Sequence, residues 1–222
     1  MTNTLRLQTQ VKEPKNPADA VIIWLHGLGA SSSDFADMPQ HLALGEKANI
    51  RYILPDAPRL PVTVNGGMVM PAWYDIKAMS VEREIDTPQL EQSAAAVQQL
   101  VDEQIAQGID SRRIIIAGFS QGGAVGYQAA LSYPKPLAGL LAHSTYFATQ
   151  NTVKAHPANA QLPILIQHGT QDPVVPEMLG QQARDALTAR GYEVTYQTYP
   201  MPHSLCLEQV QDMEQWLLKR FA

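Results

Sequence analysis

A serine between two glycines is the candidate nucleophile of this chain. The segment RRIIIAGFSQGGA places Gly118 two residues before Ser120 and Gly122 two residues after it. The aliphatic run before this GxSxG pattern and the small residues after it predict a strand that turns sharply into a helix. That turn would expose the hydroxyl at a helix N-terminus, where unpaired N–H groups favour an oxyanion. We therefore predict covalent catalysis by Ser120, the alternative being a glycine-rich turn that merely exposes a serine.

A serine hydroxyl needs a base, and the base needs a group that orients it. In chains built around this strand–serine–helix turn, the acid follows the serine and the histidine comes last. His203 lies in YPMPHS, after the last predicted strand and before the last predicted helix, and is the candidate base. His143 and His168 end predicted strands and are expected to be structural, and His156 lies in a polar connector.

The acid that orients the base is predicted to be Asp172. It lies in HGTQDPVVP, directly after a predicted strand, and Pro173 stiffens the chain behind it. The other acids before His203 fall in or beside predicted helices and strands, on faces expected to meet solvent; they are Glu177, Asp185 and Glu193. The alternative for Asp172 is an ordinary turn-forming aspartate.

Two backbone N–H groups are predicted to bind the oxyanion of a tetrahedral intermediate. One belongs to Gln121, the residue after the serine. The other is that of Leu28 in WLHGLGASSSDF, because Gly27 and Gly29 allow this loop to turn the N–H inward. His26 is expected to brace the loop rather than to act as a base.

The elements that must position these residues alternate between strands and helices. Short apolar runs predict strands, most of them buried on both faces, as in a parallel sheet covered by helices. Amphipathic stretches predict helices over 88–107, 176–190 and 204–221, with Gly108 and Gly191 at the ends of the first two. The predicted strands are Val21–Leu25, Tyr52–Leu54, Ile114–Ala117, Gly139–Ala142, Ile164–Gln167 and Val194–Tyr199.

The segment from Pro55 to Asp75 has no helical period and is rich in proline and glycine. Asn65-Gly66 suits a tight turn, so we expect a small hairpin between 62–64 and 68–70, at the edge or top of the sheet. The fold class expected from all these patterns is α/β, with a mostly parallel central sheet flanked by helices and a hairpin excursion near the active site.

Composition sets further limits. Hydrophobic residues make up 45% and charged residues 17% of the 222 residues, which is typical of one globular domain spanning 1–222. The formal charge of -5 and the dispersed basic residues argue against nucleic-acid binding. No segment predicts membrane insertion or export, and the lone Cys206 suits a reducing compartment, so we expect a cytoplasmic protein. The six histidines are dispersed without an HExxH pair, so neither a metal nor a cofactor is expected.

Taken together, the motifs resemble the carboxylesterase and acyl-protein thioesterase branch of the α/β-hydrolases, from about Val21 to the C-terminus. The resemblance rests on LHGLGASSSDF, PDAPRLPVTVNGG, MPAWYDI, AGFSQGGA and HGTQDPVVP. It implies the α/β-hydrolase fold, the triad and oxyanion donors named above, and a homodimer. It also implies that the 55–75 excursion walls an acyl groove with Met70 and Trp73 among its linings.

Two positions depart from the pattern of this branch. Pro202 stands where a glycine usually precedes the catalytic histidine, and proline removes a backbone donor and confines the loop. His143 stands where relatives tend to be aliphatic.

These observations favour a serine carboxylesterase that hydrolyses small esters through an acyl-enzyme. An acyl-protein thioesterase or a lysophospholipase is the alternative, since thioesters and esters share this chemistry. A non-catalytic binding module on the same fold is disfavoured, because all three triad residues are present.

Overall fold

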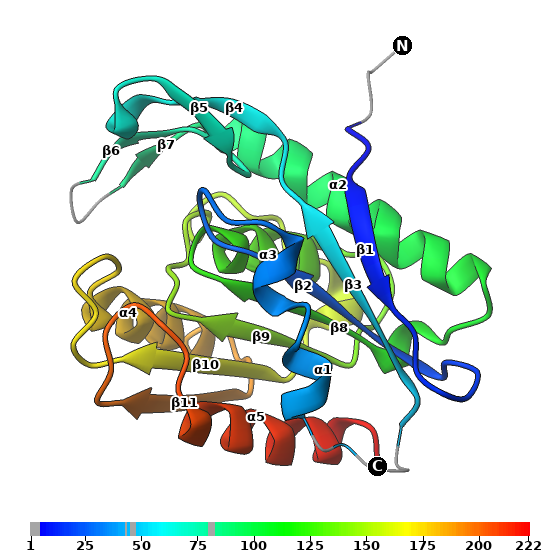
Figure 1. The fold of residues 1–222 in the computed structure, drawn as a ribbon. Coiled ribbons are helices and arrows are strands. Elements are labelled where there is room, and N and C mark those ends of the chain that lie inside the picture. The colour runs from blue at the N-terminus through cyan, green and yellow to red at the C-terminus, as the bar shows by residue number, and fades with distance from the viewer. Residues whose placement is uncertain (1–4, 43, 45–47, 80–82) are drawn as a thin grey trace.

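The computed structural model describes residues 5–42, 44, 48–79 and 83–222 (Figure 1). Within these residues the centre is a seven-stranded sheet of order β1-β3-β2-β8-β9-β10-β11. The first strand pairs antiparallel with its neighbour and all the other neighbouring pairs are parallel. The strands are β1 (Gln8–Lys12), β2 (Ala20–Leu25), β3 (Ile50–Asp56), β8 (Ile114–Phe119), β9 (Gly139–His143), β10 (Ile164–Gly169) and β11 (Val194–Tyr199).

Helices cover both faces of this sheet, as Figure 1 shows. Alternate residues of β2 face opposite sides: Ile23 belongs to the hydrophobic cluster under α2, α3 and α4, whereas Trp24 belongs to the cluster under α5. All six residues of β2 are buried, as expected for a central parallel strand. The helices are α1 (Met38–His41), α2 (Thr87–Ala106), α3 (Gln121–Ser132), α4 (Glu177–Thr188) and α5 (Leu207–Arg220).

The helix ends follow local chemistry. The Asp86 carboxylate accepts a hydrogen bond from the N–H of Gln89 and caps α2, and Pro88 occupies its first turn. Gly108 and Gly191 take positive φ values of 98° and 85° just after α2 and α4, as the sequence predicts. The last helix begins at Leu207 rather than at Ser204, because Cys206 is extended. Residues 203–206 therefore lie outside the helix.

The excursion and the segment that follows it form two small ribbons at the upper left of Figure 1. The predicted hairpin is present as β4 (Arg59–Val62) and β5 (Met68–Pro71), but Val64 lies in a 3₁₀ turn and not in a strand. Its loop is longer than a two-residue turn because Thr63–Asn65 form that 3₁₀ turn before Gly66 and Gly67, both with positive φ values, lead back to β5. The second ribbon, β6 (Ile76–Ala78) with β7 (Glu84–Ile85), has no counterpart in the sequence-based expectations.

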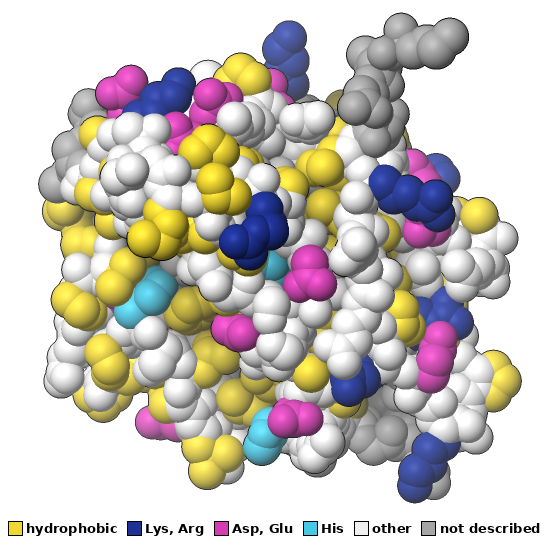
Figure 2. Space-filling model, turned by 45° about the horizontal axis from the view of Figure 1, so that its top comes forward, with side chains coloured by type: hydrophobic (Ala, Val, Ile, Leu, Met, Phe, Trp, Pro, Cys, Tyr) yellow, Lys and Arg dark blue, Asp and Glu magenta, His cyan; other side chains and the backbone are white. Residues whose placement is uncertain are grey.

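Hydrophobic side chains gather on one half of the face seen in Figure 2, and Lys and Arg side chains stand apart from one another there. Exposed large hydrophobic residues include Met68 and Val69 of β5. Met79 and Val174 are also exposed, and both line the pocket that contains Ser120. Part of the exposed wall of this pocket is therefore apolar.

Candidate active site

Ser120 lies in the turn between β8 and α3 with φ 53° and ψ −120°, a conformation that few non-glycine residues adopt. The turn is fixed from the neighbouring strand, because the N–H of Ser120 donates to the carbonyl of His143. On the other side, the hydroxyl of Thr145 donates to the carbonyl of Ser120 at 2.6 Å. The end of β9 thus holds the candidate nucleophile in its strained backbone geometry.

The two glycines of the GxSxG pattern allow strand and helix to pass closely. A Cβ atom on Gly118 would overlap the backbone of Gly122, and one on Gly122 would overlap the carbonyl of His26. Gly123 is equally confined, against the side chain of Thr145. Larger residues at these positions would push α3 away from the sheet and move the serine with it.

Asp172 follows β10, and its side chain is completely buried. Its Oδ1 accepts the N–H groups of Val174 and Val175 at 2.9 and 2.8 Å. Val175 is held in turn, because its carbonyl lies 2.8 Å from Nε2 of the buried His168, which must donate since a carbonyl only accepts. The carboxylate is therefore oriented by its own loop, and the other oxygen points to His203.

His203 meets that oxygen directly: its Nδ1 lies 2.6 Å from Oδ2 of Asp172. A carboxylate only accepts, so Nδ1 carries the proton and Nε2 is left to act as a base. The ring also packs on Phe119, with centroids 4.6 Å apart. Pro202, the departure from the branch pattern, does not prevent this contact.

Ser120 and His203 face the same pocket, which has a volume of about 460 Å³. Among the described residues, no hydrogen bond joins the Ser120 hydroxyl to the imidazole. Such bonds are commonly long in ligand-free enzymes and tighten when substrate binds. The structure thus brings together the three residues expected from the sequence, with the acid–histidine half already hydrogen-bonded.

The two expected oxyanion donors also border this pocket, because Leu28 and Gln121 are among its lining residues. Neither of their N–H groups donates to a backbone carbonyl within the described part of the chain. The Gln121 side chain is fully engaged elsewhere: its Oε1 accepts the N–H of Trp73 and its Nε2 donates to the carbonyl of Tyr74. This pair of bonds ties the start of α3 to the segment that follows β5.

His26 braces the Leu28 loop, as expected. Its Nε2 accepts the N–H of Ala57, so Nδ1 carries the proton and donates to the carbonyl of Gly27 at 2.7 Å. The carbonyl of His26 accepts the indole N–H of Trp73. With both ring nitrogens engaged and its side chain buried, His26 has no route to a substrate.

Neither of the two expected substrate-binding residues is among the residues that line this pocket. Trp73 is completely buried, and its indole N–H donates to the carbonyl of His26, so it supports the start of the Leu28 loop and is not among the pocket-lining residues. Met70 is half-buried, and its sulfur accepts from the amide of Asn65. Asn65, and not Met70, is among the pocket-lining residues.

The pocket wall contains residues that the sequence did not single out. Phe119 directly precedes the candidate nucleophile and Val174 lies two residues after the candidate acid, and this proximity in the chain is the signal that could have found them. Several more come from segments whose approach depends on the fold, among them Val64, Ile76, Met79, Arg83 and Tyr146.

The sequence profile of the phospholipase/carboxylesterase family matches residues 7–220, nearly the whole chain. The chain belongs to this family. Acyl-protein thioesterase 1 of Neurospora crassa is 38% identical over 212 residues, which cover 90% of this chain and 86% of the fungal protein.

Solved structures of similar proteins agree with this membership and with the α/β-hydrolase fold. Acyl-protein thioesterase 2 of Zea mays is 31% identical with a TM-score of 0.85, over 97% of this chain and 99% of the plant chain. Arabidopsis thaliana SOBER1 is 30% identical with the same TM-score, over 91% of this chain and 99% of its own.

In this family member three buried histidines are disfavoured as cations. Burial lowers the pKa of His26 and of His168, although their hydrogen bonds to Gly27 and Val175 act in the opposite direction. Burial lowers the pKa of His143 to about 4. His143 stacks on Trp24 and accepts from the amide of Gln209 through Nδ1, while its Nε2 has no partner among the described residues. Its side chain is completely buried and is not among the pocket-lining residues, although its carbonyl accepts the N–H of Ser120.

In the described part of the chain, no helix is long and apolar enough to cross a bilayer. No cluster of three or more His, Cys, Asp or Glu side chains suited to a metal ion occurs in the same residues.

Proposed function

We propose that this chain is a serine hydrolase that cleaves acyl thioesters and esters with Ser120 as nucleophile, His203 as base and Asp172 as orienting acid. The observation that carries the proposal is the short Asp172–His203 hydrogen bond, placed in the pocket that also contains Ser120 and two N–H groups without backbone acceptors. The nucleophile, the base with its orienting acid, and the oxyanion donors that acyl transfer requires are thus grouped at one pocket.

The steps follow from these positions. The hydroxyl oxygen of Ser120 attacks the substrate carbonyl while Nε2 of His203 takes the hydroxyl proton. The N–H groups of Leu28 and Gln121 donate to the oxyanion that forms. The imidazolium of His203, stabilised by Asp172, then gives its Nε2 proton to the sulfur or oxygen of the leaving group as the bond from that atom to the carbonyl carbon breaks, and a thiol or alcohol departs. Water attacks the acyl-serine in the same way, with His203 again as base, and releases the acid.

Acyl thioesters are the favoured substrates. The sequence alone favoured small carboxylic esters, but the relatives matched over most of the chain are named acyl-protein thioesterases, and these names support the alternative. The apolar side chains of Ile76, Met79 and Val174 in the pocket suit an acyl chain. A thiolate is also a better leaving group than an alkoxide, so the same site would cleave thioesters readily.

The test compares kcat/KM for an S-acylated peptide, the matched O-acyl serine peptide, a short-chain aryl ester and a lysophospholipid. We expect the S-acylated peptide to rank first and Ser120→Ala to lose at least about a thousandfold in kcat on every substrate. Ser33→Ala, an exposed serine outside the pocket lining, is the matched control. If the aryl ester or the lysophospholipid ranks first, the thioesterase assignment fails, and if Ser120→Ala stays active, the whole proposal fails.

A further inference from the structure

Arg83 forms part of the wall of the catalytic pocket. Its Nη2 donates to the carbonyl of Val174 at 2.5 Å and its Nη1 lies 3.2 Å from the sulfur of Met79. The guanidinium also lies over the ring of Tyr146, 4.7 Å from the centroid, and the hydroxyl of Tyr146 is fixed by that of Tyr74 at 2.6 Å. These contacts connect the β6–β7 ribbon to the loop of the candidate acid.

A second hollow lies directly behind Arg83. It has a volume of about 290 Å³ and shares Met79, Arg83 and Val174 with the catalytic pocket. These three shared residues are the ones that the Arg83 hydrogen bonds connect. Among the described residues, the contact between the Arg83 side chain and the Val174 carbonyl therefore lies at the boundary that the two hollows share.

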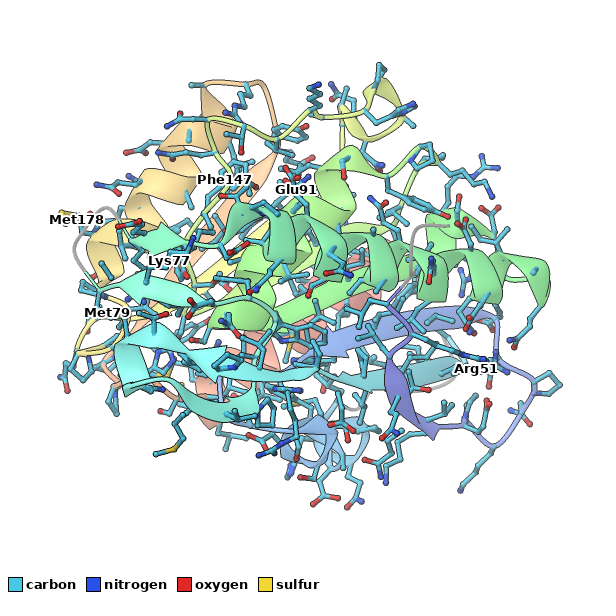
Figure 3. All side chains as sticks on the ribbon, turned by 90° about the horizontal axis from the view of Figure 1, so that it is seen from above. Arg51, Lys77, Met79, Glu91, Phe147 and Met178 are labelled. Carbon is cyan, nitrogen blue, oxygen red and sulfur yellow. The ribbon has the colours of Figure 1, made fainter. Side chains whose placement is uncertain are left out.

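The lining of this hollow is apolar apart from Arg83. It consists of Pro173, Pro176, Met178 and Leu179 besides the shared residues. Figure 3 shows Met79 and Met178 at the same end of the molecule, on the segment after β6 and on α4. An acyl chain that passed Arg83 would find a surface of the same character as the pocket it left.

A third hollow also adjoins Arg83 but is less suited to a hydrocarbon chain. It shares Arg83 and Tyr146 with the catalytic pocket, and its wall includes the polar side chains of Gln150, Asn151 and Gln182. Burying methylenes against amides leaves their hydrogen-bonding groups without water. The apolar hollow beside Met178 is the extension that an acyl chain would use.

We propose that Arg83 is a specificity-determining residue that ends the acyl pocket and restricts the enzyme to acyl chains that stop short of the Arg83–Val174 contact. This proposal rests on the proposed function, since it assigns the length limit of the same site. The Nε of Arg83 is buried and has no hydrogen-bond partner among the described residues. Its position in the wall therefore carries a desolvation cost. A small residue here would join the two hollows.

The experiment measures kcat/KM for a series of acyl thioesters from four to sixteen carbons with wild type, Arg83→Ala and Arg59→Ala. Arg59 is the matched control because its guanidinium also donates to a backbone carbonyl, that of Val69, but lies outside the pocket lining. Each methylene removed from water favours binding by roughly fourfold. We expect Arg83→Ala to raise the ratio of long-chain to short-chain kcat/KM by at least about tenfold, and Arg59→Ala to leave it unchanged.

A second variant separates a length limit from general damage. Met178 is exposed on α4 and borders the apolar hollow, so Met178→Trp fills that hollow without touching the triad. In the Arg83→Ala background, Met178→Trp should restore the short-chain preference. Loss of Arg83 could instead only loosen the Asp172 loop, in which case all chain lengths lose activity in the same proportion.

Each outcome decides one question. If the wild-type enzyme is inactive on every acyl substrate, the proposed function is refuted, and this result is distinct from a failure of the role proposed for Arg83. An active wild type with an unchanged length profile in Arg83→Ala, whether or not its overall rate falls, overturns the role of Arg83. A shifted profile that Met178→Trp does not reverse also overturns it, because the added length would then not lie in the apolar hollow.

Discussion

The α-carbon of Gly169 faces the carbonyl oxygen of Met201 so closely that no Cβ atom fits between them. Gly169 ends β10, and Met201 begins the loop that carries His203 toward Asp172. The close approach of these two backbones therefore sets the position of the imidazole. It lets the loop carrying His203 reach the candidate acid even with Pro202 in place.

Gly169→Ala is expected to lower kcat/KM by about a hundredfold, because the added methyl pushes the 201–203 backbone away and a shift of about 1 Å costs that much. Steady-state kinetics measure kcat/KM of the variant, and a thermal melt measures its stability. Gly126→Ala is the control, since its Cβ would meet side chains of the core at ordinary contact distances. Equal activity of Gly169→Ala and wild type would show that the loop position does not govern catalysis.

Asp172→Asn tests the orienting acid. The amide keeps the shape and still accepts from Val174 and Val175, but its NH₂ group would face the ring and favour the wrong tautomer of His203. We expect kcat to fall about 10⁴-fold with little change in melting temperature. Asp185→Asn, an exposed position on α4, should be silent. A rate within a factor of a few of wild type would point to a different acid.

Gln121→Glu tests the connection between the oxyanion donor and the segment after β5. A carboxylate still accepts from the N–H of Trp73 but cannot donate to the carbonyl of Tyr74, which costs about 1–3 kcal/mol of stability. We also expect turnover to fall, because the N–H of residue 121 shifts with its side chain. Gln98→Glu loses similar bonds, to Ala129 and Ser132, outside the pocket lining. A loss of turnover as large in Gln98→Glu would mean that stability alone explains it.

His143→Leu is expected to flatten the dependence of stability on acid pH. The folded pKa of His143 is about 4 and lies below the ordinary value of 6.5, so the unfolded chain binds more protons between these values. Stability is thus fully present above pH 6.5 and is lost as pH falls, by about 2–3 kcal/mol near pH 4.5. Urea unfolding at pH 7.5 and 4.5 measures the difference for each protein.

The control for that measurement is His41→Gln, because His41 is exposed on α1. The unfolding free energy of His41→Gln should fall between pH 7.5 and pH 4.5 by the same amount as that of wild type. The Leu variant also removes the partner of Gln209, so its stability at pH 7.5 is expected to be lower. The idea fails if His143→Leu loses as much stability as wild type on acidification.

The sequence predicted the elements whose signal is local. Strands such as β2 and β8 are continuous apolar runs because both faces are buried, and GxSxG lies between one such run and a helix. β1 escaped notice because QTQVK is mostly polar, and only its pairing with β3 makes it a strand. The β6–β7 ribbon is too short to carry a pattern.

The directions in which side chains of the site point could not be predicted from the sequence. Trp73 lies in the excursion that was expected to wall the acyl groove. Its indole N–H donates instead to the carbonyl of His26, which is 47 residues away in the chain. Arg83 and Tyr146 reach the wall from segments that share no spacing with the triad. Such contacts depend on the packed fold, and no single stretch of sequence encodes them.

The hairpin β4–β5 is closed at its base by the hydrogen bond from the N–H of Ala72 to Pro58, and its loop is held at Thr63, whose N–H and hydroxyl both donate to the Asp75 carboxylate. The side chains of Met68 and Val69, which follow this loop at the tip, are exposed, and no hydrogen bond or ion pair among the described residues holds them. Natural or engineered substitutions of Met68 and Val69 can therefore adapt the tip to a new acylated partner without changing the alignment of the candidate triad.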